Sequence, residues 1–146
     1  MKTIVVGVDG SKCSDAALEV AAEEASLREA RLIIISAWEV PQSAMMVLNA
    51  APGMLESFEA EAKTIVEYAV AKVREAHPTI ALVEGKAPSG HPASMLLKEA
   101  QDATLLVVGS RGRGGFAGLL LGSVSQQVIH HSPCPVIVVP PDASGC

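Results

Sequence analysis

Five short aliphatic segments constrain the fold of this 146-residue chain more than any other feature of its sequence. Apolar and polar side chains do not alternate within them, as they would in a strand with one face in water. Each segment is therefore typical of a strand that is buried on both faces, and such strands form parallel sheets covered by helices. The five segments lie at residues 3–8, 32–35, 80–83, 105–108 and 136–139.

Segments with helical periodicity separate these strands. In the first of them, Ala17, Ala21 and Ala25 fall on one face and are small enough to pack closely on a sheet. The alternation of strands and helices predicts an α/β fold with a single doubly wound five-stranded parallel sheet and right-handed crossovers. At this length we expect one domain, residues 1–146. Helices are expected at residues 14–30, 55–73, 92–101 and 123–130.

The charge of the chain argues against one class of partner and favours another. A net charge of −5 does not suit a protein that binds nucleic acid, which requires a basic surface. The charge is uneven, however, because no Asp or Glu occurs between residues 109 and 140, the stretch that contains Arg111 and Arg113. This local excess of cations favours a small anionic ligand.

Membrane and metal partners are not expected. No apolar run approaches the roughly 20 residues that a membrane-spanning helix needs. The first residues read as a strand and lack the cleavage region of a signal peptide, which predicts a cytoplasmic protein. Cys13, Cys134 and Cys146 match neither a zinc-binding nor a CxxC spacing. The adjacent His130 and His131 end a helix, where the helix dipole explains them more simply than a metal does.

A glycine-rich motif follows the fourth strand. It reads Gly109-Ser110-Arg111-Gly112, nine residues, then Gly122-Ser123. Glycines let backbone N–H groups approach an anion closely, and the N-terminus of a helix attracts the anion through the same groups. Ser123 and Gln126 have the spacing of a capping box, which predicts a helix that begins at Ser123. The motif therefore predicts a phosphate-binding loop, to which Ser123 and Ser125 would add hydroxyl donors.

A second polar cluster, Val8-Asp9-Gly10-Ser11, follows the first strand. Ligands of open α/β sheets bind at the carboxyl ends of the strands, so the cluster faces the glycine motif if strands one and four are neighbours. Asp9 would then accept hydrogen bonds from a ribose or from an adenine amino group. Taken alone, Asp9 is more typical of a helix N-cap. Arg111 and Arg113 have two open interpretations, as partners of phosphate groups and as solvated surface residues.

Two other nucleotide-binding motifs are not supported. Gly85 and Gly90 have the spacing of a P-loop, but His91 occupies the position of the required lysine. Residues 112–117 match the dinucleotide-binding pattern, but they follow the fourth strand and no acidic residue stands about 20 positions further on.

Catalytic residues are not predicted. The sequence has no evident Ser-His-acid group and no carboxylate in the glycine motif to hold a metal or orient water. Slow hydrolysis of ATP stays an alternative, and so does a purely structural role in which the glycines only form turns.

The glycine motif resembles the ATP-binding motif of the universal stress protein family. The similarity extends to Val6–Ser11 and to Ser132–Val139, and so covers essentially the whole chain. It implies a Rossmann-like sheet with strand order 3-2-1-4-5, in which strands one and four are neighbours. It also implies a nucleotide-dependent sensor or regulator of a stress response that binds ATP, alone or with Mg²⁺. AMP and cyclic AMP are alternative ligands.

The resemblance implies roles for residues at three parts of the nucleotide. Asp9 would contact adenine or ribose with Val8, Gly10 and Ser11 beside it, and the backbone at Ala37 would meet adenine. Val108 and Gly109 would flank the ribose. The phosphates would be held by Gly112, Gly122, Ser123, Val124 and Ser125, with Arg111 and Arg113 nearby.

The fifth aliphatic segment, Val136–Val139, would be an edge strand in this order. It carries no charge that would discourage pairing with another strand. We therefore predict a homodimer in which this edge pairs with its symmetry mate, as the resemblance also implies.

Overall fold

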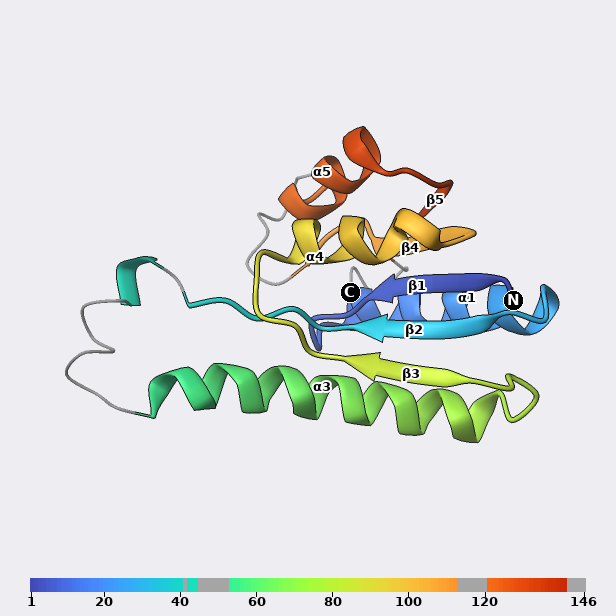
Figure 1. Cartoon of the computed structure of the whole chain (residues 1–146), viewed down its shortest axis with the longest axis horizontal. Coiled ribbons are helices and arrows are strands. Elements are labelled where there is room, and N and C mark those ends of the chain that lie inside the picture. The colour runs from blue at the N-terminus through green and yellow to red at the C-terminus, as the bar shows by residue number, and fades with distance from the viewer. Residues whose placement is uncertain (41, 45–52, 113–120, 142–146) are drawn as a thin grey trace.

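The strands of the sheet follow the order β3-β2-β1-β4-β5, and every neighbouring pair is parallel (Figure 1). The computed structural model describes residues 1–40, 42–44, 53–112 and 121–141. The predicted fold, a doubly wound five-stranded parallel sheet of Rossmann-like order, is confirmed. The strands are β1 (Thr3–Gly7), β2 (Arg31–Ile35), β3 (Val83–Lys86), β4 (Leu105–Gly109) and β5 (Val136–Val139).

Helices cover both faces of the sheet. Figure 1 shows α4 and α5 together on one side and α3 on the other, and α1 packs on the same side as α3. Each helix corresponds to an expected one, with ends shifted by a few residues. The helices are α1 (Lys12–Leu27), α3 (Met54–Ala76), α4 (Pro92–Glu99) and α5 (Ser123–His131), with short 3-10 helices at Gln42–Ala44 and Ala100–Asp102.

The sheet divides the core into two aliphatic layers. Side chains alternate between the two faces of a strand, so Ile4 and Val6 enter the layer with α1 and α3, whereas Val5 enters the layer with α4 and α5. All three are fully buried. Because both faces are covered, the central strands show no alternation of polar and apolar residues.

Small residues bring α1 close to the sheet. Ala17, Ala21 and Ala25 are fully buried on one face of the helix, as the sequence predicts. The helix begins at Lys12, earlier than expected, because Ser11 is its N-cap.

The third strand lies further along the chain than residues 80–83, where the sequence predicts it. It is an edge strand at Val83–Lys86 that packs on α3 through alternate residues, so it lacks a continuous apolar run. Val83 is buried, and a Cβ on Gly85 would collide with Val66 Cγ1 of α3. Ile80 is buried too, but it belongs to the turn after α3, where its amide donates to the His77 carbonyl at 3.2 Å.

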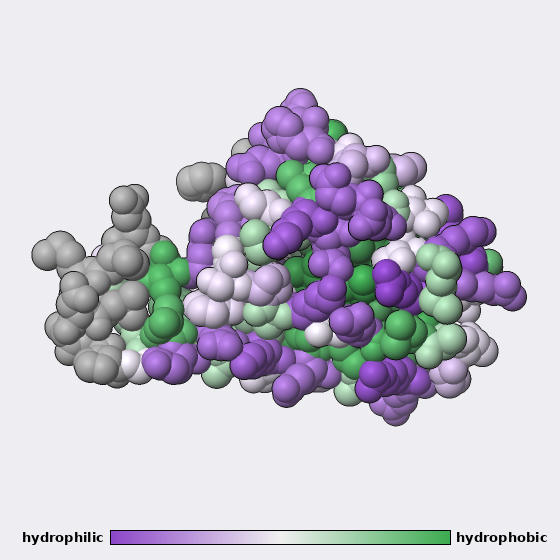
Figure 2. All heavy atoms as spheres, viewed as in Figure 1, coloured by the Kyte–Doolittle hydropathy of each residue, from purple (hydrophilic) through white to green (hydrophobic). Residues whose placement is uncertain are grey.

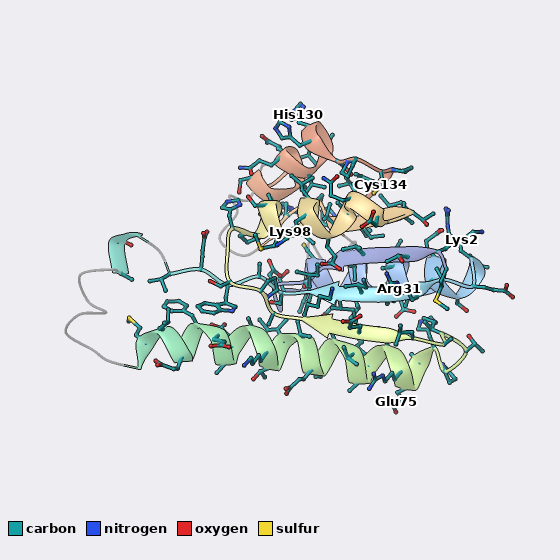
Figure 3. The ribbon with its side chains drawn as sticks, viewed as in Figure 1. Lys2, Arg31, Glu75, Lys98, His130 and Cys134 are labelled. Carbon is teal, nitrogen blue, oxygen red and sulfur yellow. The ribbon has the colours of Figure 1, made fainter. Side chains whose placement is uncertain are left out.

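The strands begin on one side of the molecule and end on the other. Lys2 and Arg31 lie near the N-terminus, on the side where the strands begin (Figure 3). The arrows in Figure 1 point to the opposite side, where the carboxyl ends of the strands meet. Figure 2 shows hydrophilic residues over much of this face of the molecule, with hydrophobic residues between the α4–α5 pair and α3. Within the described ranges, no helix has the length and apolar character that crossing a bilayer requires.

Candidate functional site

A cavity of about 450 Å³ opens at the carboxyl ends of β1, β2 and β4. Open α/β sheets bind their ligands at this position. The ends of the three strands, the start of α5 and part of α4 form its walls. Its lining includes Val8, Asp9, Ala37, Val108, Gly109, Arg111, Gly112, Gly122, Ser123, Val124 and Ser125, all of which the sequence assigns to the site.

Two further residues assigned to the site, Gly10 and Ser11, are not among those that line this cavity. Gly10, with a φ of 85°, and Ser11 form the turn that presents Asp9 to the cavity. Arg113 lies outside the described residues.

Hydrogen bonds fix the turn that carries Asp9. The Asp9 carboxylate accepts a bond from the Ser11 amide at 2.9 Å, and the Asp9 amide donates to Ser14 Oγ at 3.2 Å. Ser14 is buried, and its hydroxyl donates to the Ser11 carbonyl at 3.0 Å. The N-cap of α1 is Ser11, whose Oγ accepts from the Ser14 amide at 3.2 Å. The cap function that the sequence offers for Asp9 therefore belongs to Ser11.

Gly112 and Gly122 bring the two described ends of the glycine motif together beside Asp9. A Cβ on Gly112 would lie 2.8 Å from Asp9 Oδ2, so a side chain there would displace the carboxylate. A Cβ on Gly122 would lie 3.7 Å from the Gly112 amide nitrogen, and the Gly122 amide donates to the Ser110 carbonyl at 2.6 Å. The structure thus places Asp9 next to the glycine motif, as expected from neighbouring strands one and four.

The N-terminus of α5 reaches the cavity without a side-chain cap. The helix begins at Ser123 as predicted, but its N-cap is Gly122, which has no side chain to accept hydrogen bonds from the first amides. The expected capping box is wrong, because the Gln126 side chain donates to the Leu121 carbonyl at 3.3 Å. The first amides of a helix have no intrahelical acceptor, so those of Ser123 and Val124 can bind an anion in the cavity.

The Ser125 hydroxyl does not have the geometry expected of a phosphate donor. Ser125 is 2% exposed, and its Oγ lies 3.0 Å from the Ser110 carbonyl and 3.1 Å from the Gly122 carbonyl. A serine hydroxyl has a single proton, which is here directed to the main chain. Ser123, in contrast, is exposed and lines the cavity.

An apolar wall forms part of the same cavity. Ile35 and Val108 contribute from the sheet, and Pro92 and Leu96 from α4. Gly7 allows α4 this close to β1, because a Cβ on Gly7 would lie 2.8 Å from Leu96 Cδ1. Such a wall suits the face of a flat ring.

Sequence reasoning missed part of this lining, namely Gly7, Ser14, Ile35, Pro92 and Leu96. The sequence does hold a signal for Ile35, because it lies two residues before Ala37 and alternate residues of a strand share a face. It holds no such signal for Leu96, which reaches the cavity only through the packing of α4 on β1.

The backbone at Ala37 faces the cavity. The Ser36 amide donates to the Lys86 carbonyl at 3.0 Å, and the Trp38 amide donates to the Pro88 carbonyl at 3.0 Å. Main-chain groups of successive residues in an extended chain point to opposite sides. The amide and carbonyl of Ala37 therefore point away from the β3 side, towards the cavity that Ala37 lines.

The described lining of the cavity holds two charged side chains. Among the described lining residues, Arg111 is the only cation and Asp9 the only carboxylate. The described parts of the chain hold no group of three His, Cys, Asp or Glu residues that could bind a metal ion. His130 lies on the outer side of α5, directed away from the sheet (Figure 3).

Comparison with known proteins gives one family. The chain matches the model of the universal stress protein family over residues 1–140. A universal stress protein of Mycobacterium tuberculosis is 39% identical over 136 residues, which are 92% of this chain and 43% of that relative. The chain thus spans less than half the length of this curated relative.

Solved structures give the same family. UspA from Lactobacillus plantarum has a TM-score of 0.80 at 23% identity, over 94% of this chain and 97% of that one, which shows a common fold. A universal stress protein crystallised in complex with cAMP has a TM-score of 0.70 at 31% identity, over 95% of this chain and 96% of that one. By its match to the family model and its identity to these relatives, this chain belongs to the universal stress protein family.

Proposed function

We propose that this chain binds an adenine nucleotide in the cavity, and that the nucleotide is ATP. The observation that carries the proposal is the uncapped N-terminus of α5, which meets Gly112, Gly122 and Arg111 at one cavity. Free helix amides and a guanidinium are a strong combination for phosphate oxygens. The related structure crystallised with cAMP supports a nucleotide as the ligand.

The backbone of Ala37 supports adenine as the base. Its amide can donate to N1 of adenine and its carbonyl can accept from the N6 amino group, which is the pattern that adenine offers. Guanine presents a carbonyl and a protonated nitrogen at the same positions, so it would face the Ala37 carbonyl and amide with mismatched groups. The apolar side chains of Ile35, Val108 and Leu96 would cover the ring.

Asp9 would bind the ribose, which joins the base to the phosphates. Its carboxylate accepts a hydrogen bond from the Ser11 amide, adjoins Gly112 and lines the same cavity as the apolar wall and the start of α5. A carboxylate accepts hydrogen bonds from the two hydroxyls of a ribose. Mg²⁺ would accompany ATP chiefly through the phosphates, because Asp9 is the only carboxylate in the described lining.

A titration with adenine and guanine nucleotides tests the proposal. ATP, AMP, cAMP and GTP are added to the purified chain, and binding is followed by calorimetry and by the fluorescence of Trp38, the single tryptophan, which follows Ala37 directly. ATP should bind with a dissociation constant of about micromolar order, at least about tenfold tighter than GTP. No heat and no fluorescence change at millimolar ATP would refute the proposal.

Cyclic AMP is the second candidate ligand. It is favoured by the related complex at 31% identity. Cyclic AMP carries one phosphate, so it would use the α5 amides without needing further cations. Tighter binding of cAMP than of ATP in the same titration would select this alternative.

A protein that binds a nucleotide without consuming it can act as a sensor of a stress condition. Nucleotide occupancy would bias the conformations of a cytoplasmic homodimer and so report a stress condition. Slow ATP hydrolysis is the competing proposal, and Asp9 is the one described lining residue that could orient water for it. Turnover well above background that is abolished by Asp9→Ala would establish the enzyme.

A further inference from the structure

The Ser110 carbonyl is the point where the two ends of the glycine motif meet. It accepts hydrogen bonds from the Gly122 amide at 2.6 Å and from Ser125 Oγ at 3.0 Å. Ser110 is itself bound to the sheet, because its amide donates to the Val139 carbonyl at the end of β5 at 2.8 Å. The acceptor is therefore fixed by the sheet, whereas both donors belong to the start of α5.

We infer that Ser125 is a positioning residue for phosphate binding. The Ser125 hydroxyl shares its proton between the carbonyls of Ser110 and Gly122, an arrangement here called the Ser125 contact. This contact holds the first turn of α5 so that the Ser123 and Val124 amides face the cavity. Ser125 acts through the helix and not by touching the ligand, because its one proton is used by the main chain. The inference rests on the proposed function, since it concerns the affinity for the phosphates of the same ligand.

Removing the Ser125 contact leaves no main-chain acceptor without a partner. The Ser110 carbonyl keeps the Gly122 amide, and the Gly122 carbonyl keeps the Gln126 amide at 3.0 Å. Ser125→Ala should therefore fold, while the first turn of α5 loses one of the bonds that fix its direction. The ligand must then order the Ser123 and Val124 amides when it binds, and the free-energy cost of that ordering reduces its affinity.

Ser110 offers a matched control. Its Oγ is buried and has no hydrogen-bond partner among the described residues. Ser110→Ala deletes a buried hydroxyl at the same junction, yet it keeps the carbonyl to which Gly122 and Ser125 donate. The two alanine variants therefore differ in whether the Ser125 contact is lost.

The test compares ATP and adenosine, which share base and ribose and differ in the phosphates. Calorimetry on Ser125→Ala should show ATP bound about five- to tenfold more weakly, as expected for one net hydrogen bond, and adenosine bound as in the wild type. Ser110→Ala should bind both ligands as the wild type does. Hydrogen exchange of the Gly122 amide, measured without ligand, should be faster in Ser125→Ala only.

The outcomes separate this inference from the proposed function. Wild-type ATP affinity in Ser125→Ala, or an equal loss for adenosine and ATP, would overturn the positioning role. A wild-type chain that binds no nucleotide would overturn the proposed function instead. In that case the exchange rate of the Gly122 amide alone decides whether Ser125 holds the first turn of α5, and an unchanged rate rejects it.

Discussion

Gly112 shows at the scale of one residue why the site requires a glycine. The position has no positive φ to explain its residue type, but its missing side chain leaves room for the Asp9 carboxylate. The glycine therefore serves the packing of two functional segments that are far apart in sequence. A turn-only role, the structural alternative for the glycine motif, does not explain this contact.

Gly112→Ala should weaken ATP binding by about tenfold, because the new methyl group displaces the carboxylate. Stability should fall by no more than about 1 kcal/mol, since a side-chain end can move aside. Calorimetry and urea denaturation measure the two effects. In an Asp9→Ala background, Gly112→Ala should change the ATP affinity little, because no carboxylate is left to displace. If the losses of ATP binding free energy in the two single variants added fully in the double variant, displacement of Asp9 would not be the cause.

The unpartnered Ser110 hydroxyl gives a prediction on stability. The buried Ser110 hydroxyl has no partner in the part of the chain that the structure describes, which is unfavourable, so Ser110→Ala should leave the free energy of unfolding unchanged or raise it by up to about 1 kcal/mol. Ser125→Ala should lower it by about 1 kcal/mol, because it removes a made bond. Urea denaturation of both variants gives the comparison. A larger loss for Ser110→Ala than for Ser125→Ala would contradict it.

At the scale of elements, the contact of α3 with β3 depends on a glycine as well. Gly85 lies beneath α3, where a Cβ would collide with Val66 Cγ1 and lie 2.9 Å from Val70 Cγ2. Branched valine side chains adjust poorly, because their χ1 angle is restricted. The glycine that gives residues 85–90 a P-loop-like spacing thus has a packing reason instead.

Gly85→Ala should destabilise the protein by about 1–3 kcal/mol through overpacking. Val66→Ala in the same chain should recover part of that loss, so the double variant should be more stable than the sum of the single effects predicts. Denaturant unfolding of the four proteins completes the cycle. ATP affinity is the internal control, since Gly85 does not line the described cavity; strict additivity would show that the collision does not occur.

At the scale of the whole molecule, the predicted homodimer depends on β5, whose outer edge would form the interface. Its four residues are half-buried, and within the described chain it pairs only with β4. The amides of Leu106 and Ser110 donate to the carbonyls of Pro135 and Val139, so the main chain of Val138 faces the open edge. No described strand pairs with that side of β5, so a second copy of the strand could pair there.

Val138→Pro should convert the homodimer to a monomer, because it removes an outward amide while leaving the bonds to β4 in place. Sedimentation velocity at micromolar concentration measures the change, with ATP affinity as evidence that the fold survives. A monomeric wild type would refute the homodimer. A dimeric Val138→Pro variant would assign the interface to another surface.

The architecture could be predicted from the sequence because its signals are local. Buried strands in the centre of a parallel sheet are apolar throughout, so β1, β2 and β4 are visible as aliphatic runs. The edge strand β5 is visible too, because all four of its residues are aliphatic. The other edge strand, β3, has no aliphatic run, because its sequence Val-Glu-Gly-Lys has two exposed residues, so the sequence predicts the strand too early in the chain. In the site, Asp9 and the glycine motif were identifiable from residue type and from position after a strand.

The sequence alone determined which segments become strands and helices and which residues gather at their carboxyl ends, because periodicity and turn chemistry act over a few neighbouring residues. Only the tertiary structure decided what the site residues contact. It placed Gly112 against Asp9, brought Leu96 to the cavity past Gly7, and turned the Ser125 hydroxyl to the Ser110 carbonyl. These contacts join elements that are distant in the chain, and their distances depend on how helices pack on the sheet, which no local pattern encodes.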